Sequence, residues 1–214
     1  MGLKGVAWLG GALIAAYAGI LLRFCFARGA NSFIGVAVTL IAVGAASIHY
    51  HARPHLTTLV LVPVYAWILD NERTRPTFKA WLLIPLMAAW TNLHGGFMVG
   101  IILAGAAAVG TAAEVLLGRP GAEWKTARRF GLVTAGLIAA TFVNPYTYQL
   151  HVHVAKYLSS DWIRSVVDEF RSPDFRGEAM LQFEALLILG MICVASFVRQ
   201  KRIVEVLWLL GFAH

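Results

Sequence analysis

The sequence predicts an all-α protein that crosses a membrane several times, and three features of the chain lead to this fold class. Of its 214 residues, 59% are hydrophobic and 14% are charged. Soluble domains carry about 25% charged residues. The mean hydropathy is +0.70. The charges also sit in short clusters between long apolar stretches, which is typical of a polytopic membrane protein. We expect one transmembrane domain over residues 1–214.

Eight apolar segments divide the chain, and each is expected to form a membrane helix. A helix needs about 20 apolar residues to cross the hydrocarbon core, and ~17 is the lower end of the range. The segments lie at residues 5–22, 33–48, 56–69, 80–93, 97–117, 130–143, 181–198 and 203–214. The third and fourth are short, so they need flanking residues, a thinner bilayer or a break that lines a cavity.

The positive charge of the chain fits a membrane topology better than nucleic-acid binding. Lys and Arg number 18 against 11 Asp and Glu, which gives a net charge of +7. Twelve of the 18 basic residues fall on alternate connections, and the positive-inside rule places those connections in the cytoplasm. We therefore expect the lipid bilayer and no nucleic acid as a partner. Glu114, Glu184 and Glu205 lie near segment ends, where they are expected to reach the interface.

Three polar motifs fall on the connections predicted to face outward, at residues 53–55, 92–96 and 144–146. Arg53 fits phosphate binding, because a guanidinium can bind phosphate through two parallel hydrogen bonds. A charged side chain that reaches the membrane surface is the simpler interpretation of the same residue. Asn92 and His94 are polar groups near membrane depth, which mark either a site or a glycine-rich turn.

The connection over residues 144–180 is predicted to form an amphipathic outer loop. Leu150, Val154, Leu158 and Trp162 recur at helical spacing, so two short helices are expected to lie on the membrane interface. Further along, Asp168 and Glu169 supply carboxylates for general-base chemistry or for contacts with a sugar. A solvated loop explains these two acidic residues nearly as well.

Histidines recur near the outward connections, and a divalent metal is one interpretation of them. They are His49, His51, His55, His94, His151 and His153. With Asp168 or Glu169 they supply enough ligands, but no spacing among them fixes a metal geometry. Hydrogen-bonded histidines at the interface are the simpler interpretation.

Small residues recur at every fourth position of the fifth apolar segment and predict close helix packing. They are Gly96, Gly100, Ala104, Ala108 and Ala112. Such a stripe lets a neighbouring helix approach closely.

Four motifs together resemble a known family. They are Arg53-Pro54-His55, Trp90-Thr91-Asn92-Leu93-His94-Gly95-Gly96-Phe97, Asn144-Pro145-Tyr146 and Ser172-Pro173-Asp174-Phe175. In this combination the chain resembles bacterial multi-spanning proteins that look like the GT-C class of membrane glycosyltransferases. These enzymes take sugars from polyprenyl-phosphate donors at the outer membrane face. The resemblance runs over about residues 33–214.

The resemblance implies an outer-face site for a polyprenyl-phosphate-linked sugar in the bacterial inner membrane. Arg53 and His94 would contact the donor phosphate. The candidates for other substrate contacts are His55, Asn92, Asn144, Tyr146, Asp168 and Glu169.

One departure from the family pattern keeps other functions open. GT-C enzymes carry an acidic residue soon after their first span, and this chain has none before Asp70, which the charge distribution places in the cytoplasm. A fragment that lacks its N-terminal catalytic part fits this departure, as does a non-catalytic relative. Half of a transporter or channel, and a non-catalytic subunit of an envelope assembly, are the alternative functions.

Overall fold

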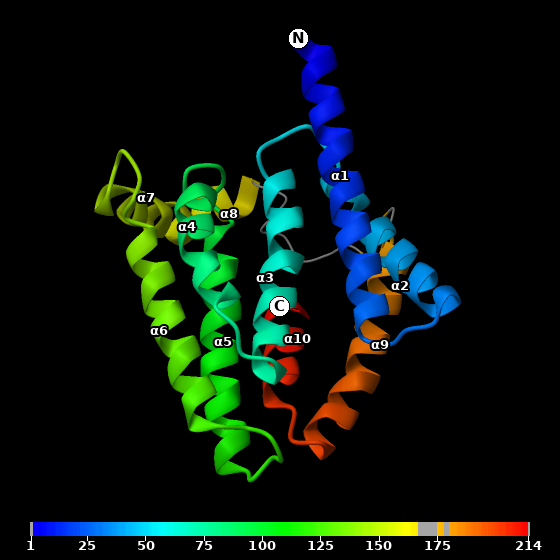
Figure 1. Cartoon of the computed structure of the whole chain (residues 1–214). Helices are drawn as coiled ribbons and strands as arrows, with labels where there is room; N and C mark the ends of the chain where they lie inside the picture. Colours follow the sequence, from blue (N-terminus) through cyan, green and yellow to red (C-terminus); the bar gives the residue numbers. More distant parts are fainter. Residues whose placement is uncertain (1, 167–174, 178–179, 214) are drawn as a thin grey trace.

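The computed structural model describes residues 2–166, 175–177 and 180–213, and every regular element in these ranges is helical. The prediction of an all-α fold is therefore confirmed. The elements are α1 (Gly2–Ala27), α2 (Ser32–Ala45), the 3₁₀ helix η1 (Ala46–His49), α3 (Leu56–Thr74), α4 (Lys79–Thr91), α5 (Phe97–Leu116), α6 (Trp124–Ala140), α7 (Tyr148–Ser159), α8 (Asp161–Val166), α9 (Met180–Arg199) and α10 (Ile203–Ala213) (Figure 1).

Four helices are long and apolar enough to cross a membrane: α1, α2 together with η1, α5 and α9. They support a membrane protein that contacts the lipid bilayer. The predicted number of eight spans is not reached on these criteria. Helix α4 has 13 residues and α10 has 11, while α3 carries Asp70, Glu72 and Arg73 in its last turns.

The long helices run side by side, and α7 and α8 lie across one end of them (Figure 1). Helix α5 packs against α6, α3 and α10, whereas α1, α2 and α9 form the opposite side of the molecule. We call the end with η1, residues 50–55, the α4–α5 connection and α7 the cavity end. The end with the connections after α1, α3, α5 and α9 is the charged end.

The hydrophobic core lies among α3, α4, α5 and α6, which include the shorter helices. Tyr65, Trp90 and Phe97 are almost fully buried. The rings of Tyr65 and Trp90 pack edge to face with centroids 5.1 Å apart, and the Tyr65 hydroxyl donates to the Leu83 carbonyl at 2.7 Å. In contrast, α9 buries none of its residues. The shorter helices and α5 are therefore central, and the long apolar helices α1, α2 and α9 lie outside them with their side chains available to lipid.

A buried ion cluster joins the helices at the charged end, and Arg73 is its centre. The Arg73 guanidinium lies 2.9 Å from a Glu114 carboxylate oxygen, 2.9 Å from Glu205 and 3.7 Å from Asp70. The side chains of Arg73 and Glu114 are only 7% and 1% exposed. Because buried charges are costly unless they are paired, this cluster holds α3, α5 and α10 together.

Further contacts extend the cluster to neighbouring segments. Arg28, just after α1, pairs with Asp70, while Arg119 lies 2.6 Å from Glu114 and Arg202 lies 2.6 Å from Glu205. Glu114 and Glu205 therefore lie in a shared ion cluster, whereas the sequence predicted separate charges that reach the interface. The prediction missed the cluster because it treated each segment end by itself.

The small-residue stripe of α5 packs against helices of the same chain. A Cβ atom on Gly100 would lie 2.8 Å from Met87 and from Trp90, so α4 fills this part of the stripe. Ala104 is fully buried. Gly110, two positions beyond Ala108 of the stripe, meets α10: a Cβ there would lie 2.8 Å from the Val204 Cα.

Replacing Arg73 with Met should destabilise the protein strongly, because Glu114 and Glu205 would stay buried without their shared cation. Removing one partner of a buried ion pair typically costs about 3–5 kcal/mol. Unfolding in mixed micelles measures the loss. Arg75→Met is the matched control, since Arg75 is exposed two residues further on. An equal effect of both substitutions would contradict the role of the cluster.

Replacing Gly110 with Ala should lower stability by about 1–3 kcal/mol, because the new methyl group collides with the backbone of α10. Gly105→Ala in the same helix is the control, since its Cβ would lie 3.9 Å from Thr134. The same unfolding measurement compares the two variants. If Gly105→Ala is the more harmful change, α10 does not pack against α5 at Gly110.

Candidate functional site

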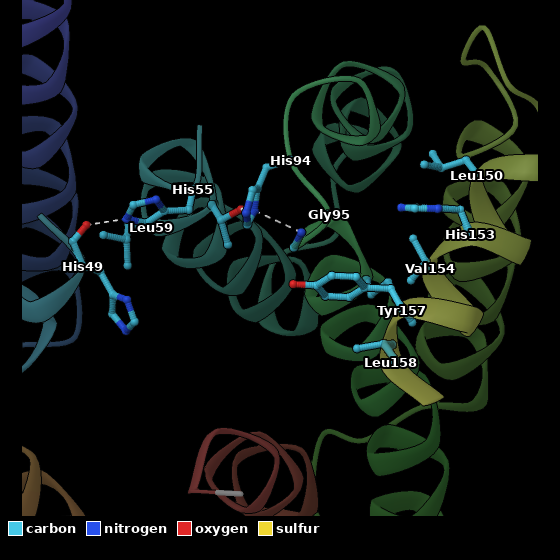
Figure 2. A pocket seen from close by; sticks show the side chains of 13 residues that line it. His49, His55, Leu59, His94, Gly95, Leu150, His153, Val154, Tyr157 and Leu158 are labelled. Atoms are coloured by element: carbon cyan, nitrogen blue, oxygen red, sulfur yellow. Dashed lines mark hydrogen bonds between the residues drawn. The ribbon is translucent and has the colours of Figure 1, made fainter. Parts of the chain in front are cut away.

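A cavity of about 710 Å³ opens at the cavity end, between the start of α3, the α4–α5 connection and α7 (Figure 2). Its apolar lining residues are Leu59, Met98, Leu150, Val154 and Leu158. Its polar side chains are His49, His55, Thr58, His94, His153 and Tyr157. The structure thus brings together the motifs around His55 and His94, which are 39 residues apart in the sequence.

The turn that leads into α3 places His55 on the cavity wall and Arg53 beside it. The His55 ring donates from Nε2 to the His49 carbonyl. The backbone carbonyl of Pro54 accepts the amide of Thr57 at 3.1 Å, so the helical turn begins at the proline, where the missing amide proton costs nothing. Arg53 is exposed and lies outside the cavity lining.

Tyr50 anchors this turn to α2. Its hydroxyl donates to the Val43 carbonyl at 2.9 Å. Burial raises the pKa of the Tyr50 phenol, which keeps the hydroxyl a donor. The chain between η1 and α3 is therefore held at both ends, by Tyr50 and by His55.

A hydrogen-bonded chain of three side chains holds His94. The Trp90 indole donates to the Thr58 hydroxyl at 3.0 Å, and Thr58 lies 2.9 Å from His94 Nδ1. The Gly96 amide also donates to His94 Nδ1, at 3.1 Å. A Cβ atom on Gly96 would lie 2.7 Å from the Thr58 hydroxyl, so this close approach requires glycine. The glycine-rich turn therefore holds the His94 ring in position beside Thr58.

Asn92 and Asn144 lie outside the cavity lining and bind backbone groups. The Asn92 amide donates to the carbonyls of Ala88 at 2.7 Å and Val143 at 2.8 Å, so it joins the ends of α4 and α6. The Asn144 amide donates to the Thr141 carbonyl at 2.7 Å, and its oxygen accepts the Tyr146 amide at 2.8 Å. These bonds shape the connection into α7.

The remaining predicted site residues lie apart from the cavity or outside the described chain. Tyr146 is 65% exposed and does not line the cavity. Asp168, Glu169 and the motif Ser172-Pro173-Asp174 lie outside the described residues.

His151 anchors α7, which forms one wall of the cavity. The Thr141 hydroxyl donates to the Ile138 carbonyl at 2.6 Å, so its oxygen accepts the bond from His151 Nε2 at 2.8 Å. The His151 ring stacks on Phe142 with centroids 4.5 Å apart. None of the residues of α7 is buried. The helix therefore depends on His151 more than on a hydrophobic face.

The histidines do not form a metal site with other described residues. His49 and His55 have ring centroids 6.0 Å apart, and His55 and His94 are 6.2 Å apart. Within residues 2–166, 175–177 and 180–213, no group of three or more His, Cys, Asp or Glu side chains is placed to hold a metal ion.

Sequence reasoning missed Thr58, Trp90 and Tyr157 as residues of the site. Thr58 follows His55 by three residues, so it lies on the same face of α3, and this spacing is a usable signal. Trp90 was noted only as part of a motif. Tyr157 belongs to the predicted amphipathic helix, but only the packing of α7 across the bundle end shows that it faces the cavity.

A second cavity of about 310 Å³ lies at the charged end, lined by the ion cluster and the α5–α6 connection. Helix α3 runs from the first cavity at Thr58 to the second at Arg73, and Tyr65, half-way along it, is fully buried. No protein-family model, no curated protein and no solved structure matches the chain.

Replacing His151 with Ala should loosen α7 without unfolding the protein. The loss of the bond to Thr141 and of the stack on Phe142 should speed amide hydrogen exchange across α7 by about tenfold or more, which corresponds to a loss of ~1.4 kcal/mol in local stability. Hydrogen exchange read by mass spectrometry measures this. His153→Ala is the control, because His153 lies on the same helix and lines the cavity. Equal exchange in the two variants would show that His151 is not the anchor.

Proposed function

We propose that the chain is a membrane protein with a GT-C-like role, in which sugar is transferred from a polyprenyl-phosphate donor at the outer membrane face. The observation that carries the proposal is the composition of the cavity at the cavity end. It joins an apolar wall from α7 to a cluster of imidazole groups at the start of α3 and before α5. A lipid phosphate has the same two parts, an apolar chain and an anionic head.

The apolar wall suits a prenyl chain. Leu150, Val154 and Leu158 repeat along one face of α7, and Met98 at the start of α5 lies across from them. Burial of a CH₂ group is worth about 0.8 kcal/mol, so even a few prenyl carbons bind appreciably. Because α7 lies across the end of the helices and lines the cavity, a prenyl chain would lie against its apolar face.

The polar side of the cavity suits a phosphate head. His94 supplies a ring N–H group to the cavity, and Arg53 lies in the same turn as His55. The described lining of the cavity contains no carboxylate that would repel an anion. Asn92, Asn144 and Tyr146 then lie in the surrounding connections, near enough in the fold to serve an acceptor or the sugar.

The topology follows from the distribution of basic residues. The charged end lies in the cytoplasm and the cavity end lies outside. Helices α3, α4, α6 and α10 pass through the membrane beside the four apolar ones, and the 13-residue α4 and the 11-residue α10 need flanking residues or a locally thinner bilayer to do so. A bacterial inner membrane is the setting. A carboxylate base is lacking among the described lining residues, so the chain acts either with Asp168 or Glu169 or as a partial enzyme.

The transporter alternative has less support. Transport requires a path that joins the two sides, and Tyr65, half-way along α3 from one cavity to the other, is fully buried. The buried charges at the charged end are paired with one another rather than arranged along such a path.

Farnesyl phosphate, a short polyprenyl phosphate, should stabilise the detergent-purified chain against heat. A ligand that binds only the folded state adds about 2.7 kcal/mol at 100 times its Kd. Arg53→Ala and His94→Ala should each reduce the shift. Farnesol and inorganic phosphate separate the contributions of the chain and the head.

Two controls make this test decisive. Arg75→Ala removes an exposed arginine at the charged end and should leave the shift unchanged. Stabilisation by farnesol equal to that by farnesyl phosphate, or an equal shift in all variants, would mean that the cavity does not bind a phosphate.

A further inference from the structure

The hydrogen bonds of His94 fix the position of its proton. Nδ1 of His94 receives the Gly96 amide, which can only donate. Because Nδ1 already accepts the Gly96 amide proton, the Thr58 hydroxyl, which accepts the Trp90 indole N–H, directs its own proton to the same Nδ1. A nitrogen that accepts two hydrogen bonds carries no proton. In the neutral ring, the proton of His94 therefore sits on Nε2.

In His55 the ring nitrogen that is hydrogen-bonded to the protein is the protonated one, whereas in His94 it is the unprotonated one. Its Nε2 bonds to the His49 carbonyl, and a carbonyl can only accept, so Nε2 carries the proton. Its Nδ1 is then the unprotonated, basic nitrogen of the neutral ring. Within the described chain, Nδ1 of His55 has no hydrogen-bond partner. A carbonyl that orients one ring nitrogen is a common way to set the tautomer of a histidine that acts through the other nitrogen.

We infer that His55 and His94 form an acid–base pair in the cavity, with His55 Nδ1 as the proton acceptor and His94 Nε2–H as the proton donor. This inference rests on the proposed sugar transfer. Both rings line the cavity, and their centroids lie 6.2 Å apart, so neighbouring atoms of one ligand can reach both (Figure 2). Thr58 and Trp90 are positioning residues, because they act through His94.

His55 supplies the general base, since no carboxylate lines the cavity among the described residues. His55 Nδ1 takes the proton from the acceptor hydroxyl as the acceptor oxygen forms its bond to the anomeric carbon of the sugar. The bond from that carbon to the phosphate oxygen breaks, and its electron pair leaves with the polyprenyl phosphate. His94 Nε2–H donates a hydrogen bond to the departing phosphate. The proton gained by His55 returns to water, so no oxidant or further reactant is needed.

The proton positions can be measured without any ligand. Long-range ¹H–¹⁵N spectra of the full chain with ¹⁵N-labelled histidine, recorded at about pH 8.5, above the range in which histidine normally gains its charge, separate protonated from unprotonated ring nitrogens. His94 should show a protonated Nε2 and a bare Nδ1. Thr58→Val removes one of the two donors to Nδ1, leaves the Gly96 amide, and should increase the share of rings protonated on Nδ1. Thr57→Val is the matched control, because the Thr57 hydroxyl binds the Pro54 carbonyl instead.

The chemical role needs a second measurement. Farnesyl phosphate that carries a radiolabelled glucose serves as the donor, and release of glucose to water is the readout. His55→Gln keeps a donor for the His49 carbonyl but has no basic nitrogen, so release should fall by about 10²–10⁴-fold while binding of farnesyl phosphate stays within about twofold. His51→Gln changes an exposed histidine of the turn before α3 that lies outside the cavity lining, and should release glucose at the wild-type rate.

The outcomes separate this inference from the proposed function. A protonated Nδ1 on His94 in the wild type would overturn the acid–base pair. Release of glucose by the His55→Gln variant at the wild-type rate would also overturn it. So would the absence of release by the wild-type protein when farnesyl phosphate binds. Failure of farnesyl phosphate to bind would overturn the proposed function instead, whatever the spectra show.

Discussion

The pairing of Arg73 with carboxylates on two other helices is the constraint on which the rest of this structure depends. A guanidinium that is only 7% exposed needs partners, and Glu114 on α5 and Glu205 on α10 supply them at 2.9 Å. Arg73 is the cation that the two carboxylates share, while Arg119 pairs with Glu114 alone and Arg202 with Glu205 alone. The cluster therefore selects one arrangement of α3, α5 and α10. It also explains how α10, with 11 residues, holds a place in the core, since Glu114 additionally accepts the Val204 amide at 3.1 Å.

The same two helices, α3 and α5, carry the candidate site at their other ends. Thr58 lies four turns from Arg73 along α3, and Gly96 comes directly before α5. A helix is stiff over this length, so the register fixed by the ion cluster also fixes whether the Thr58 hydroxyl meets the His94 ring. The contact between the rings of Tyr65 and Trp90 links α3 to α4 between the two ends. The chemistry of the cavity thus depends on charges at the far side of the protein.

Much of the fold could be predicted from the sequence, because long apolar runs and alternating basic connections are local signals. They located the helices and placed the motifs around His55 and His94 at one end. The contacts that depend on the register between helices could not be predicted from the sequence. Glu114 and Glu205 looked like separate interfacial charges, and Thr58 looked like an ordinary residue of α3. The count of eight spans stays a prediction beyond the four long apolar helices, since apolarity does not distinguish a helix that faces lipid from one packed inside. Asn92 and Asn144 stood out as polar residues, although in the structure the Asn92 amide joins the ends of α4 and α6 and the Asn144 amide closes a backbone turn.

Helix α10 is held in register with α5 at three heights. Val204 and Glu205 engage the ion cluster, the Val204 backbone lies against Gly110, and the Trp208 indole donates to the Leu103 carbonyl at 3.0 Å. A slide of one turn would put a larger side chain where Gly110 now allows contact, and would break the bonds above and below it. Helix α10 is therefore fixed relative to α5 and does not slide along it. Large relative motion in this protein would have to occur elsewhere, and the turn before α10, where Lys201 adopts a positive φ of 56°, is the natural limit of the rigid unit.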